Sequence, residues 1–363
     1  MLEIDIRKRL GRFALEMRFR APARGITALF GRSGSGKTSV LAAIAGLARP
    51  DAGRIAVGDT VLFDSERGVD VRPELRRVGY VFQDARLFPH LTVRDNLRYG
   101  WKRAPQAERR IGFDEVVALL GIGHLLDRRP GRLSGGEKQR VAVGRALLVQ
   151  PRILLMDEPL ASLDAARKRE ILHYIERLRD ETHIPIVYVS HEIEEVVRLA
   201  DTMVLVSEGR AAACDTVPAI MNRLDLKPMT GRFEGGAVLD GVVAFQDLDY
   251  GLSRIVFPGG ELQATGVDAL PGERVRVRIR SRDVSIALTV PERISIRNVL
   301  AGRVVEVGPL DGAEVDLRIA VGASTLLARL TRRSFEELGL GAGSDVFAMV
   351  KSVAIDRRSA GYA

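Results

Sequence analysis

One run of residues near the N-terminus has the composition and spacing of a phosphate-binding loop. It matches the pattern GxxxxGK[ST] and stands between an apolar segment and a stretch with helical spacing, which is the context such a loop requires. Its glycines let backbone N–H groups surround phosphate oxygens at the start of a helix, Lys37 reaches the terminal phosphates, and the Thr38 hydroxyl binds Mg²⁺. We therefore predict a site for a nucleoside triphosphate with Mg²⁺. Its residues are Gly31, Arg32, Ser33, Gly34, Ser35, Gly36, Lys37 and Thr38.

Two adjacent carboxylates, Asp157 and Glu158, follow the apolar segment 153–156. Successive side chains of a strand point to opposite faces, but the chain turns where the strand ends, so both acids can face one ligand. Combined with the phosphate-binding loop, the pair predicts that Asp157 holds the magnesium ion through water and that Glu158 polarises the attacking water. Without that loop, such a pair is structural more often than catalytic.

Two further polar residues, Gln83 and His191, come directly after the apolar segments 78–82 and 186–190. The carboxyl ends of parallel strands converge on a ligand, so both side chains are expected near the phosphates. Phosphoryl transfer depends on polar groups placed around the γ-phosphate. We expect Gln83 and His191 to complete the catalytic set, with Gln83 also serving as a magnesium ligand.

The segments that must position these residues form an α/β pattern. From residue 2 to about 223, short apolar strands alternate with helical stretches, which predicts a substantially parallel sheet. A more helical portion covers about 87–150. From residue 235 onward, segments rich in valine and isoleucine between glycine and proline turns predict an all-β, OB-like C-terminal region. We therefore expect two domains, 1–230 and 235–363.

The overall composition limits the class of protein. Of the 363 residues, 46% are hydrophobic and 28% charged, which is typical of a globular chain that is not embedded in a membrane. No apolar run approaches the ~20 residues that span a bilayer, and the N-terminus does not resemble a secretory signal. We expect a cytoplasmic chain, which the single cysteine, Cys214, also favours. The net charge of +8 is scattered, so we expect no nucleic-acid partner.

The run LSGGE at residues 133–137 resembles the signature motif of ABC ATPases. Together with the motifs above and the run ASLD that ends at Asp164, it makes residues 2–223 similar to that family. The resemblance implies a P-loop NTPase fold with a helical subdomain, hydrolysis of ATP, and a head-to-tail homodimer. In that dimer Ser134, Gly135 and Gly136 of one copy close over nucleotide held by the other copy, and Asp164 lies at the interface. The residue types in this run are consistent with that role, because the run begins a helix whose N-terminus can bind an anion.

Many members of this family stack an aromatic side chain on adenine near position 13. Here the neighbourhood reads Leu10-Gly11-Arg12-Phe13. Phe13 either stacks on the base or faces the core, and the sequence leaves both alternatives open. The sequence therefore predicts the phosphate contacts and leaves the contact with the base open.

Residues 85–93 resemble the segment through which importer ATPases contact the coupling helices of their permeases. The resemblance implies a pair of integral membrane permeases contacted near Leu87, Phe88, Pro89 and His90. It also places the chain peripherally on the cytoplasmic face of the inner membrane. Exposed Leu87 and Phe88 side chains would mark the partner surface. The alternative is that both side chains pack inside the helical portion.

The C-terminal region must carry any signal for the transported substrate, because that substrate never enters the nucleotide site. Stretches near 295–300 and 349–353 look like small β-barrel modules of the Mop or TOBE type, which bind molybdate and related oxyanions, and we place this module at about 291–357. Hydroxyl, amide and cationic groups suit a tetrahedral dianion. The alternative is a regulatory barrel without a ligand. The candidate oxyanion residues are Ser295, Arg297, Asn298, Lys351 and Ser352.

The stretches 46–55 and 76–90 resemble the ATPase subunits of molybdate importers more closely than their sugar, polyamine or sulfate counterparts. We therefore expect ATP-driven import of molybdate, or of tungstate, delivered to the permease by an external molybdate-binding protein. Importers of sulfate, sugar, polyamine or iron are the alternative. An ABC ATPase acting on nucleic acid would need coiled-coil insertions or tandem nucleotide domains, which this sequence lacks. The intact catalytic set argues against a pure oxyanion sensor.

Overall fold

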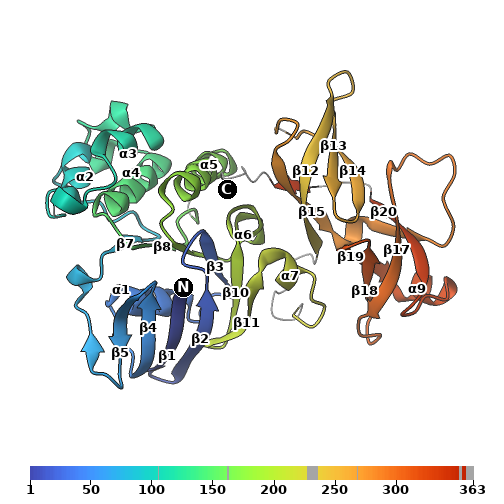
Figure 1. The fold of residues 1–363 in the computed structure, drawn as a ribbon, viewed down its shortest axis with the longest axis horizontal. Coiled ribbons are helices and arrows are strands. Elements are labelled where there is room, and N and C mark those ends of the chain that lie inside the picture. Colours follow the sequence, from blue (N-terminus) through green and yellow to red (C-terminus); the bar gives the residue numbers. More distant parts are fainter. Residues whose placement is uncertain (105, 162, 227–235, 268, 351–353, 357–363) are drawn as a thin grey trace. The chain divides into compact units, whose positions relative to one another are not determined.

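A computed structural model describes residues 1–104, 106–161, 163–226, 236–267, 269–350 and 354–356 of the chain. It divides into two compact units, Met1–Asp215 and Thr216–Ala363, which we call the nucleotide unit and the C-terminal unit. Figure 1 shows the first in blue to yellow-green and the second in yellow to red. None of the described helices combines the length and the apolar character needed to cross a membrane.

The nucleotide unit is built on one 11-stranded sheet. Its strands are β1 (Leu2–Leu10), β2 (Phe13–Ala21), β3 (Ile26–Phe30), β4 (Ala52–Val57), β5 (Thr60–Asp64), β6 (Val69–Asp70), β7 (Val78–Val81), β8 (Ile153–Asp157), β9 (Ile186–Ser190), β10 (Thr202–Ser207) and β11 (Arg210–Thr216). Their order is β6-β5-β4-β1-β2-β11-β10-β3-β9-β8-β7. The strands from β10 to β7 pair in parallel, whereas β1, β2, β4, β5 and β6 pair antiparallel. The predicted α/β fold is confirmed.

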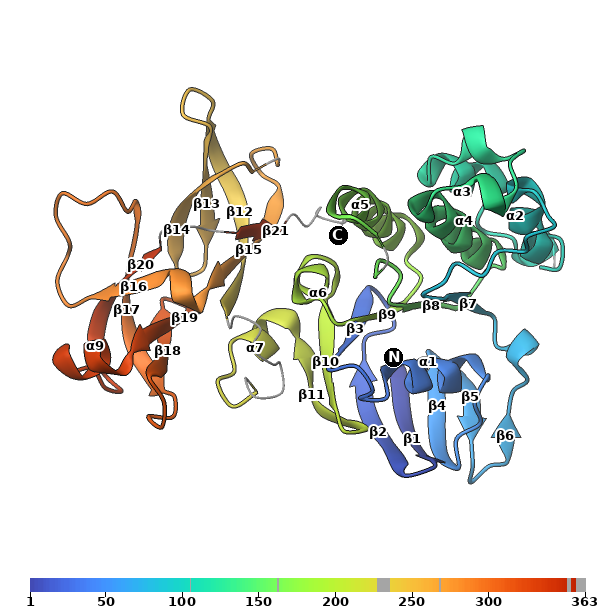
Figure 2. The same cartoon turned by 180° about the vertical axis from the view of Figure 1, so that it is seen from behind.

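The central strands are apolar because helices cover both faces of the parallel part. Every residue of β3, β8 and β9 is buried, which is typical of parallel strands between two helical layers. The helices of this unit are α1 (Lys37–Ala45), α2 (Val93–Trp101), α3 (Phe113–Leu119), α4 (Gly135–Leu148), α5 (Ala165–Thr182) and α6 (Ile193–Leu199). Figures 1 and 2 show α2, α3 and α4 as one group beside the β7 end of the sheet, which is the predicted helical subdomain.

A buried arginine fixes the far end of the helix that follows the phosphate-binding loop. Arg76 is 1% exposed, and its guanidinium donates hydrogen bonds to the carbonyl oxygens of Ala43 and Ile44 at 2.8 and 3.0 Å. The same group pairs with Asp70 at 3.0 Å. A cation at the C-terminus of a helix satisfies carbonyl groups that lack partners within the helix. Arg76 therefore ties α1 to the segment that leads into β7.

The C-terminal unit contains two 5-stranded antiparallel sheets around one apolar core. The first consists of β12 (Gly236–Asp247), β13 (Leu252–Phe257), β14 (Gly260–Thr265), β15 (Arg274–Arg280) and β21 (Ala354–Asp356). The second consists of β16 (Val284–Ala287), β17 (Asn298–Val307), β18 (Glu314–Val321), β19 (Ser324–Thr331) and β20 (Asp345–Val350). The predicted β-rich character is confirmed. The short helices α7 (Val217–Met221) and α9 (Arg332–Glu337) were not predicted.

Candidate nucleotide site

The phosphate-binding loop joins the buried strand β3 to helix α1. Gly34 and Gly36 have φ values of 79° and 104°, in a left-handed region that glycine enters without steric cost. A Cβ atom on Gly31 would lie 2.1 Å from the carbonyl oxygen of Val206, so the close approach of these backbones requires glycine. The loop ends at the N-terminus of α1, where free N–H groups and the helix dipole favour an anion.

Lys37 is a buried cation that forms no ion pair with a carboxylate among the described residues. It is 5% exposed, and its Nζ donates hydrogen bonds of 2.8 Å to the carbonyl oxygens of Gly31 and Arg32. Burial lowers the pKa of Lys37, and two nearby carboxylates oppose that shift. In the same loop, the buried Ser35 hydroxyl has no hydrogen-bond partner within the described chain. A buried cation and an unsatisfied hydroxyl in one loop fit a polyanionic ligand such as a triphosphate.

The structure brings together two of the three predicted magnesium ligands. Asp157 lies at the end of β8 and accepts a hydrogen bond of 3.1 Å from the Thr38 hydroxyl and one of 3.3 Å from the Tyr80 hydroxyl. Burial raises the pKa of Asp157, and the bonds from Thr38 and Tyr80 oppose this. The described residues include no group of three or more His, Cys, Asp or Glu side chains arranged for a metal. The Thr38 hydroxyl and the Asp157 carboxylate are oxygen ligands of the kind that Mg²⁺ takes together with phosphate oxygens and water.

Glu158 and His191 form a pair at the ends of the neighbouring strands β8 and β9. Oε2 of Glu158 lies 3.1 Å from Nδ1 of His191. Glu158 has a φ of 44°, which is uncommon for a residue other than glycine, and its N–H donates to the carbonyl oxygen of Val189. The chain therefore turns sharply after Asp157. This turn aims the Glu158 carboxylate at His191, and a strained backbone at such a position is typical of functional sites.

The signature run forms the N-terminus of α4. The Ser134 hydroxyl accepts a hydrogen bond from the Glu137 N–H, and the Glu137 carboxylate accepts one of 2.6 Å from the Ser134 N–H. The bond from the Ser134 N–H lowers the pKa of Glu137. This reciprocal capping box fixes the first turn of the helix and leaves Gly135 exposed. The predicted helix opening is therefore present, with an exposed N-terminus that suits an anion.

Asp164 begins α5 in the same way, since its carboxylate accepts a hydrogen bond of 3.0 Å from the Arg167 N–H. That bond lowers the pKa of Asp164. A Cβ atom on Gly135 would lie 3.4 Å from the Leu163 side chain, so the signature run and the Asp164 turn are neighbours. In the described chain, by contrast, no hydrogen bond or ion pair joins 133–137 to the phosphate-binding loop.

Comparisons with known proteins follow the same order of motifs. The ABC transporter profile matches residues 15–161, and the TOBE domain profile matches residues 294–356. The molybdenum import ATP-binding protein ModC of Paramagnetospirillum magneticum is 53% identical over 358 residues, which is 98% of each chain. The chain belongs to the ABC transporter family. Its ModC relatives in Rhodospirillum rubrum and Mesorhizobium japonicum are 50% and 52% identical, over 98% and 99% of this chain and 98% and 97% of theirs.

Solved ABC structures share the fold of the nucleotide unit. A dimeric ATP-binding cassette in a post-hydrolysis state, bound to ADP and Pi, is 25% identical with a TM-score of 0.50. A second structure of the same cassette, also dimeric, is 24% identical with a TM-score of 0.50. Each covers 60% of this chain and 98% of its own length. The predicted P-loop NTPase fold is therefore confirmed.

Phe13 lies directly beside the phosphate-binding loop of this ABC ATPase. A Cβ atom on Gly36 would lie 3.3 Å from the Phe13 ring, and one on Gly209 would lie 3.2 Å from it. The ring is half-buried and also packs against the core of the nucleotide unit. The ring therefore has one side against the core and one side beside the loop, and its stacking on adenine stays a prediction.

The segment after β7 carries Gln83 and the predicted permease contact. Gln83 is exposed, whereas Leu87 and Phe88 are half-buried. The ring centroids of Phe88 and Tyr99 lie 4.5 Å apart, and the Phe88 N–H and carbonyl group both bond to the buried Asn96 side chain. For Phe88 the structure thus favours packing inside the helical subdomain over a fully exposed position.

The candidate oxyanion residues occupy different surroundings in the C-terminal unit. Ser295 and Arg297 are exposed, and Asn298 is 6% exposed at the start of β17. The Asn298 amide accepts a 2.7 Å hydrogen bond from the Gln263 N–H and donates one of 3.0 Å to the Gln263 carbonyl oxygen. It therefore joins β17 to β14. Lys351 and Ser352 lie outside the described residues.

A buried network behind His191 was missed in the sequence. The Glu195 carboxylate is 5% exposed and accepts hydrogen bonds from the Tyr188 hydroxyl at 2.8 Å and the Ser190 hydroxyl at 2.7 Å. Lys168 of α5 lies 3.6 Å from it, and burial raises the pKa of Glu195. The network fixes the turn that carries His191. Its only signal in the sequence is an acid four residues after His191, which is also the spacing of an ordinary helix surface.

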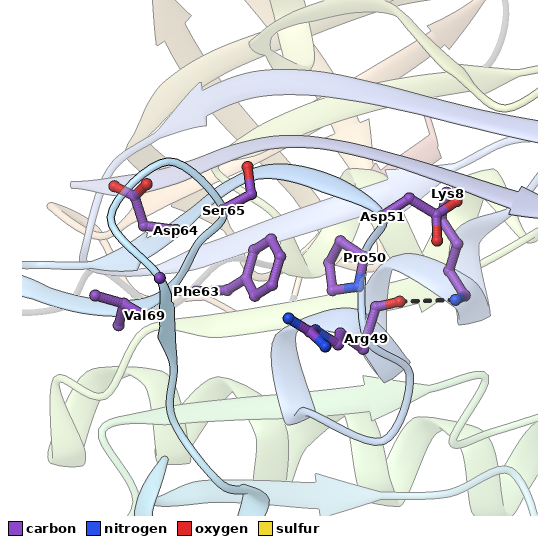
Figure 3. A pocket seen from close by; sticks show the side chains of 9 residues that line it. Lys8, Arg49, Pro50, Asp51, Phe63, Asp64, Ser65 and Val69 are labelled. Carbon is purple, nitrogen blue, oxygen red and sulfur yellow. Dashed lines mark hydrogen bonds between the residues drawn. The ribbon is translucent and has the colours of Figure 1, made fainter.

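A separate cavity of about 610 Å³ lies in the antiparallel part of the nucleotide unit (Figure 3). Figure 3 shows the Lys8 ammonium bonded to the Arg49 carbonyl oxygen, at 2.7 Å, beside the rings of Pro50 and Phe63. None of the predicted nucleotide residues lines it. Its lining residues are Lys8, Arg49, Pro50, Asp51, Phe63, Asp64, Ser65, Gly68 and Val69.

Replacing Lys37 by methionine removes the buried cation but keeps a side chain of similar length. We expect the affinity for ATP to fall about 100-fold, because a charge-assisted hydrogen bond to phosphate contributes about 2 to 3 kcal/mol. Titration with a fluorescent ATP analogue measures this. The matched control is Lys102→Met at the exposed end of α2, which should bind like the wild type. Equal affinity in Lys37→Met would contradict the assignment.

Proposed function

We propose that this chain hydrolyses ATP to drive molybdate import through a membrane permease. ATP hydrolysis is supported by one observation. The Lys37 ammonium, the Thr38–Asp157 pair and the Glu158–His191 pair converge around one loop. Import of molybdate is supported by relatives that match nearly the whole chain, including the C-terminal unit, and are named molybdenum import ATP-binding proteins. The reaction is transfer of the γ-phosphoryl group to water, which releases ADP and phosphate.

Each catalytic group has a defined task in this reaction. Lys37 and the loop N–H groups hold the β- and γ-phosphates. Thr38, Asp157 and Gln83 would hold Mg²⁺, which would supply positive charge to offset the negative charge on the phosphates. Glu158 accepts a hydrogen bond from the attacking water and so aims its oxygen at the γ-phosphorus atom. His191 orients the Glu158 carboxylate through the 3.1 Å contact and donates toward the γ-phosphate.

The active assembly is proposed to be a head-to-tail homodimer. Two anion-binding helix ends occur in one chain, at Lys37 and at Gly135, and no described hydrogen bond joins their loops. Ser134, Gly135 and Gly136 of one copy then close on ATP held by the other copy. Asp164 beside them faces the same interface. Phe13 stacks on adenine from its position next to the loop. The related solved cassette that shares this fold is described as dimeric in both of its structures.

The dimer is proposed to bind a pair of permease subunits from the cytoplasmic side of the inner membrane. The contact lies near Leu87, Phe88, Pro89 and His90, of which Pro89 and His90 are exposed. An external binding protein delivers molybdate to the permease. This arrangement places ATP hydrolysis and substrate passage in different proteins, so the coupling must pass through this segment.

In the C-terminal unit we propose an oxyanion site formed by Ser295, Arg297 and Asn298 together with Lys351 and Ser352. The Ser295 hydroxyl and Arg297 guanidinium lie on the surface, where a ligand can reach them. Within the described residues, its two bonds to Gln263 use one N–H and one lone pair of the Asn298 amide, so one of each is available to a ligand. Donors and cations without a metal suit molybdate, which is a tetrahedral dianion.

Replacing Glu158 by glutamine removes the acceptor that orients the attacking water. We expect the hydrolysis rate to fall at least 100-fold while ATP affinity stays within about twofold. The ATP-bound dimer should then accumulate, as light scattering on a sizing column would show. Glu66→Gln, at an exposed residue after β5, serves as the control and should behave like the wild type. Undiminished hydrolysis in Glu158→Gln would remove this residue from the mechanism.

Replacing Arg297 by alanine removes a cation from the proposed oxyanion site. We expect the full chain to bind molybdate in a calorimetric titration and the variant to bind it at least about tenfold more weakly, because hydrogen bonds from charged groups contribute about 1.5 to 3 kcal/mol. Arg293→Ala, at an exposed arginine in the same connection, is the matched control. If the wild-type chain takes up no molybdate at millimolar concentration, this site does not exist.

A further inference from the structure

Helix α4 begins at the signature run and also touches the segment between Gln83 and the proposed permease contact. The Gln139 amide donates a 3.4 Å hydrogen bond to the carbonyl oxygen of Phe82. The Arg145 guanidinium donates to the carbonyl oxygens of Arg86, at 2.9 Å, and Ala85, at 3.2 Å. Three hydrogen bonds from one helix therefore reach the backbone of residues 82–86, one just before Gln83 and two just before the proposed permease contact.

Arg145 holds this backbone without a carboxylate partner among the described residues. Its guanidinium carbon lies 5.2 Å from the centroid of the Phe88 ring, and burial lowers the pKa of Arg145. A half-buried arginine loses hydration, and among the described residues carbonyl oxygens and an aromatic face compensate for that loss. The planar fork of arginine fits two neighbouring carbonyl oxygens at once, which lysine cannot match.

The backbone held by Arg145 has an unusual conformation. Arg86 has a φ of 45°, a left-handed value that non-glycine residues adopt only when their surroundings impose it. The carbonyl group of this same residue receives the 2.9 Å hydrogen bond from Arg145. The Arg86 side chain in turn lies 4.3 Å above the Phe82 ring. The contact from α4 therefore falls on the residue where the segment turns.

We propose that Arg145 is the positioning residue through which α4 transmits closure of the nucleotide site to the permease contact. The inference rests on the proposed function. The signature run at one end of α4 lies about 16 Å from Arg145 along the helix, and a helix moves over that length as a rigid body. When Ser134 binds the ATP held by the partner copy, α4 moves with it. The two hydrogen bonds from the Arg145 guanidinium then move the backbone at Ala85 and Arg86 together with α4.

This link acts in both directions, because coupling between two binding sites is reciprocal. A permease that moves residues 87–90 displaces the same carbonyl groups and, through α4, the signature run. The segment also begins at Gln83, so its position sets how this side chain reaches the nucleotide. Arg145 itself contacts the carbonyl groups of Ala85 and Arg86 and the Phe88 ring. Its role is to make Gln83 and the permease contact at 87–90 move together with α4.

The test uses the complete complex in lipid nanodiscs with the permease and its molybdate-loaded binding protein. The ratio of stimulated to basal ATP hydrolysis is measured for the wild type, Arg145→Ala and Arg103→Ala. Arg103 is the matched control, because it also stacks on an aromatic ring, Tyr99, and donates to a carbonyl oxygen, but only within its own helix end. We expect Arg145→Ala to lose at least tenfold in this ratio and Arg103→Ala to retain it.

Two further measurements separate positioning from folding. The affinity for ATP and the melting temperature of Arg145→Ala should stay close to those of Arg103→Ala. If Arg145→Ala does not fold, the stimulated-to-basal ratio is measured on Arg145→Met instead. That variant keeps the packing against Phe88 and loses only the two hydrogen bonds and the charge. Arg145→Lys restores the charge and one donor, so it should recover part of the ratio.

A stimulated-to-basal ratio in folded Arg145→Ala or Arg145→Met equal to that of Arg103→Ala would overturn the role of Arg145. An equal fall of basal and stimulated rates would also overturn it, since a purely structural residue predicts that result. Failure of the proposed function has a different signature. In that case the wild-type chain itself would show no stimulation by the permease and no molybdate uptake.

Discussion

The burial of Lys37 among carbonyl oxygens is the interaction on which the nucleotide site depends. A cation that is 5% exposed and forms no ion pair within the described chain is costly unless an anion arrives beside it. The position of Lys37 is fixed by glycines that allow the loop to approach Val206. It is also fixed by the Arg76 guanidinium, which holds the far end of α1. The fold thus keeps a positive charge at the position where we propose that the terminal phosphates bind.

The parallel sheet supplies the remaining groups, because the ends of β7, β8 and β9 meet at the same edge. Asp157 ends β8, and the left-handed turn at Glu158 directs the next carboxylate toward His191 after β9. The buried Glu195 carboxylate accepts hydrogen bonds from the Ser190 and Tyr188 hydroxyls, and these bonds hold the His191 turn in place. The Glu158–His191 geometry therefore depends on the buried hydrogen bonds to Glu195 as well as on the strand ends.

The sequence was most informative where a motif sets the backbone. Glycine spacing predicted the loop at Lys37, and apolar segments predicted the strands that place Asp157 and His191, because local steric rules and burial decide both. The contacts of Arg145 and Glu195 were not predictable, since each joins residues far apart in the sequence by a side chain with no motif of its own. Phe88 was ambiguous for the same reason, as its half-buried position depends on Tyr99 and Asn96 of another element.

The central claim is that one chain supplies two halves of a site that it cannot complete alone. Mixing Lys37→Met with Gly135→Asp tests this most directly. In Gly135→Asp an acidic side chain stands at the helix end that must accept phosphate, so neither homodimer has an intact site. The heterodimer regains one site, built from the phosphate-binding loop of one variant and the signature run of the other. The account predicts that the mixture hydrolyses ATP at least tenfold faster than either variant by itself. A mixture no faster than the sum of the two variants would contradict it.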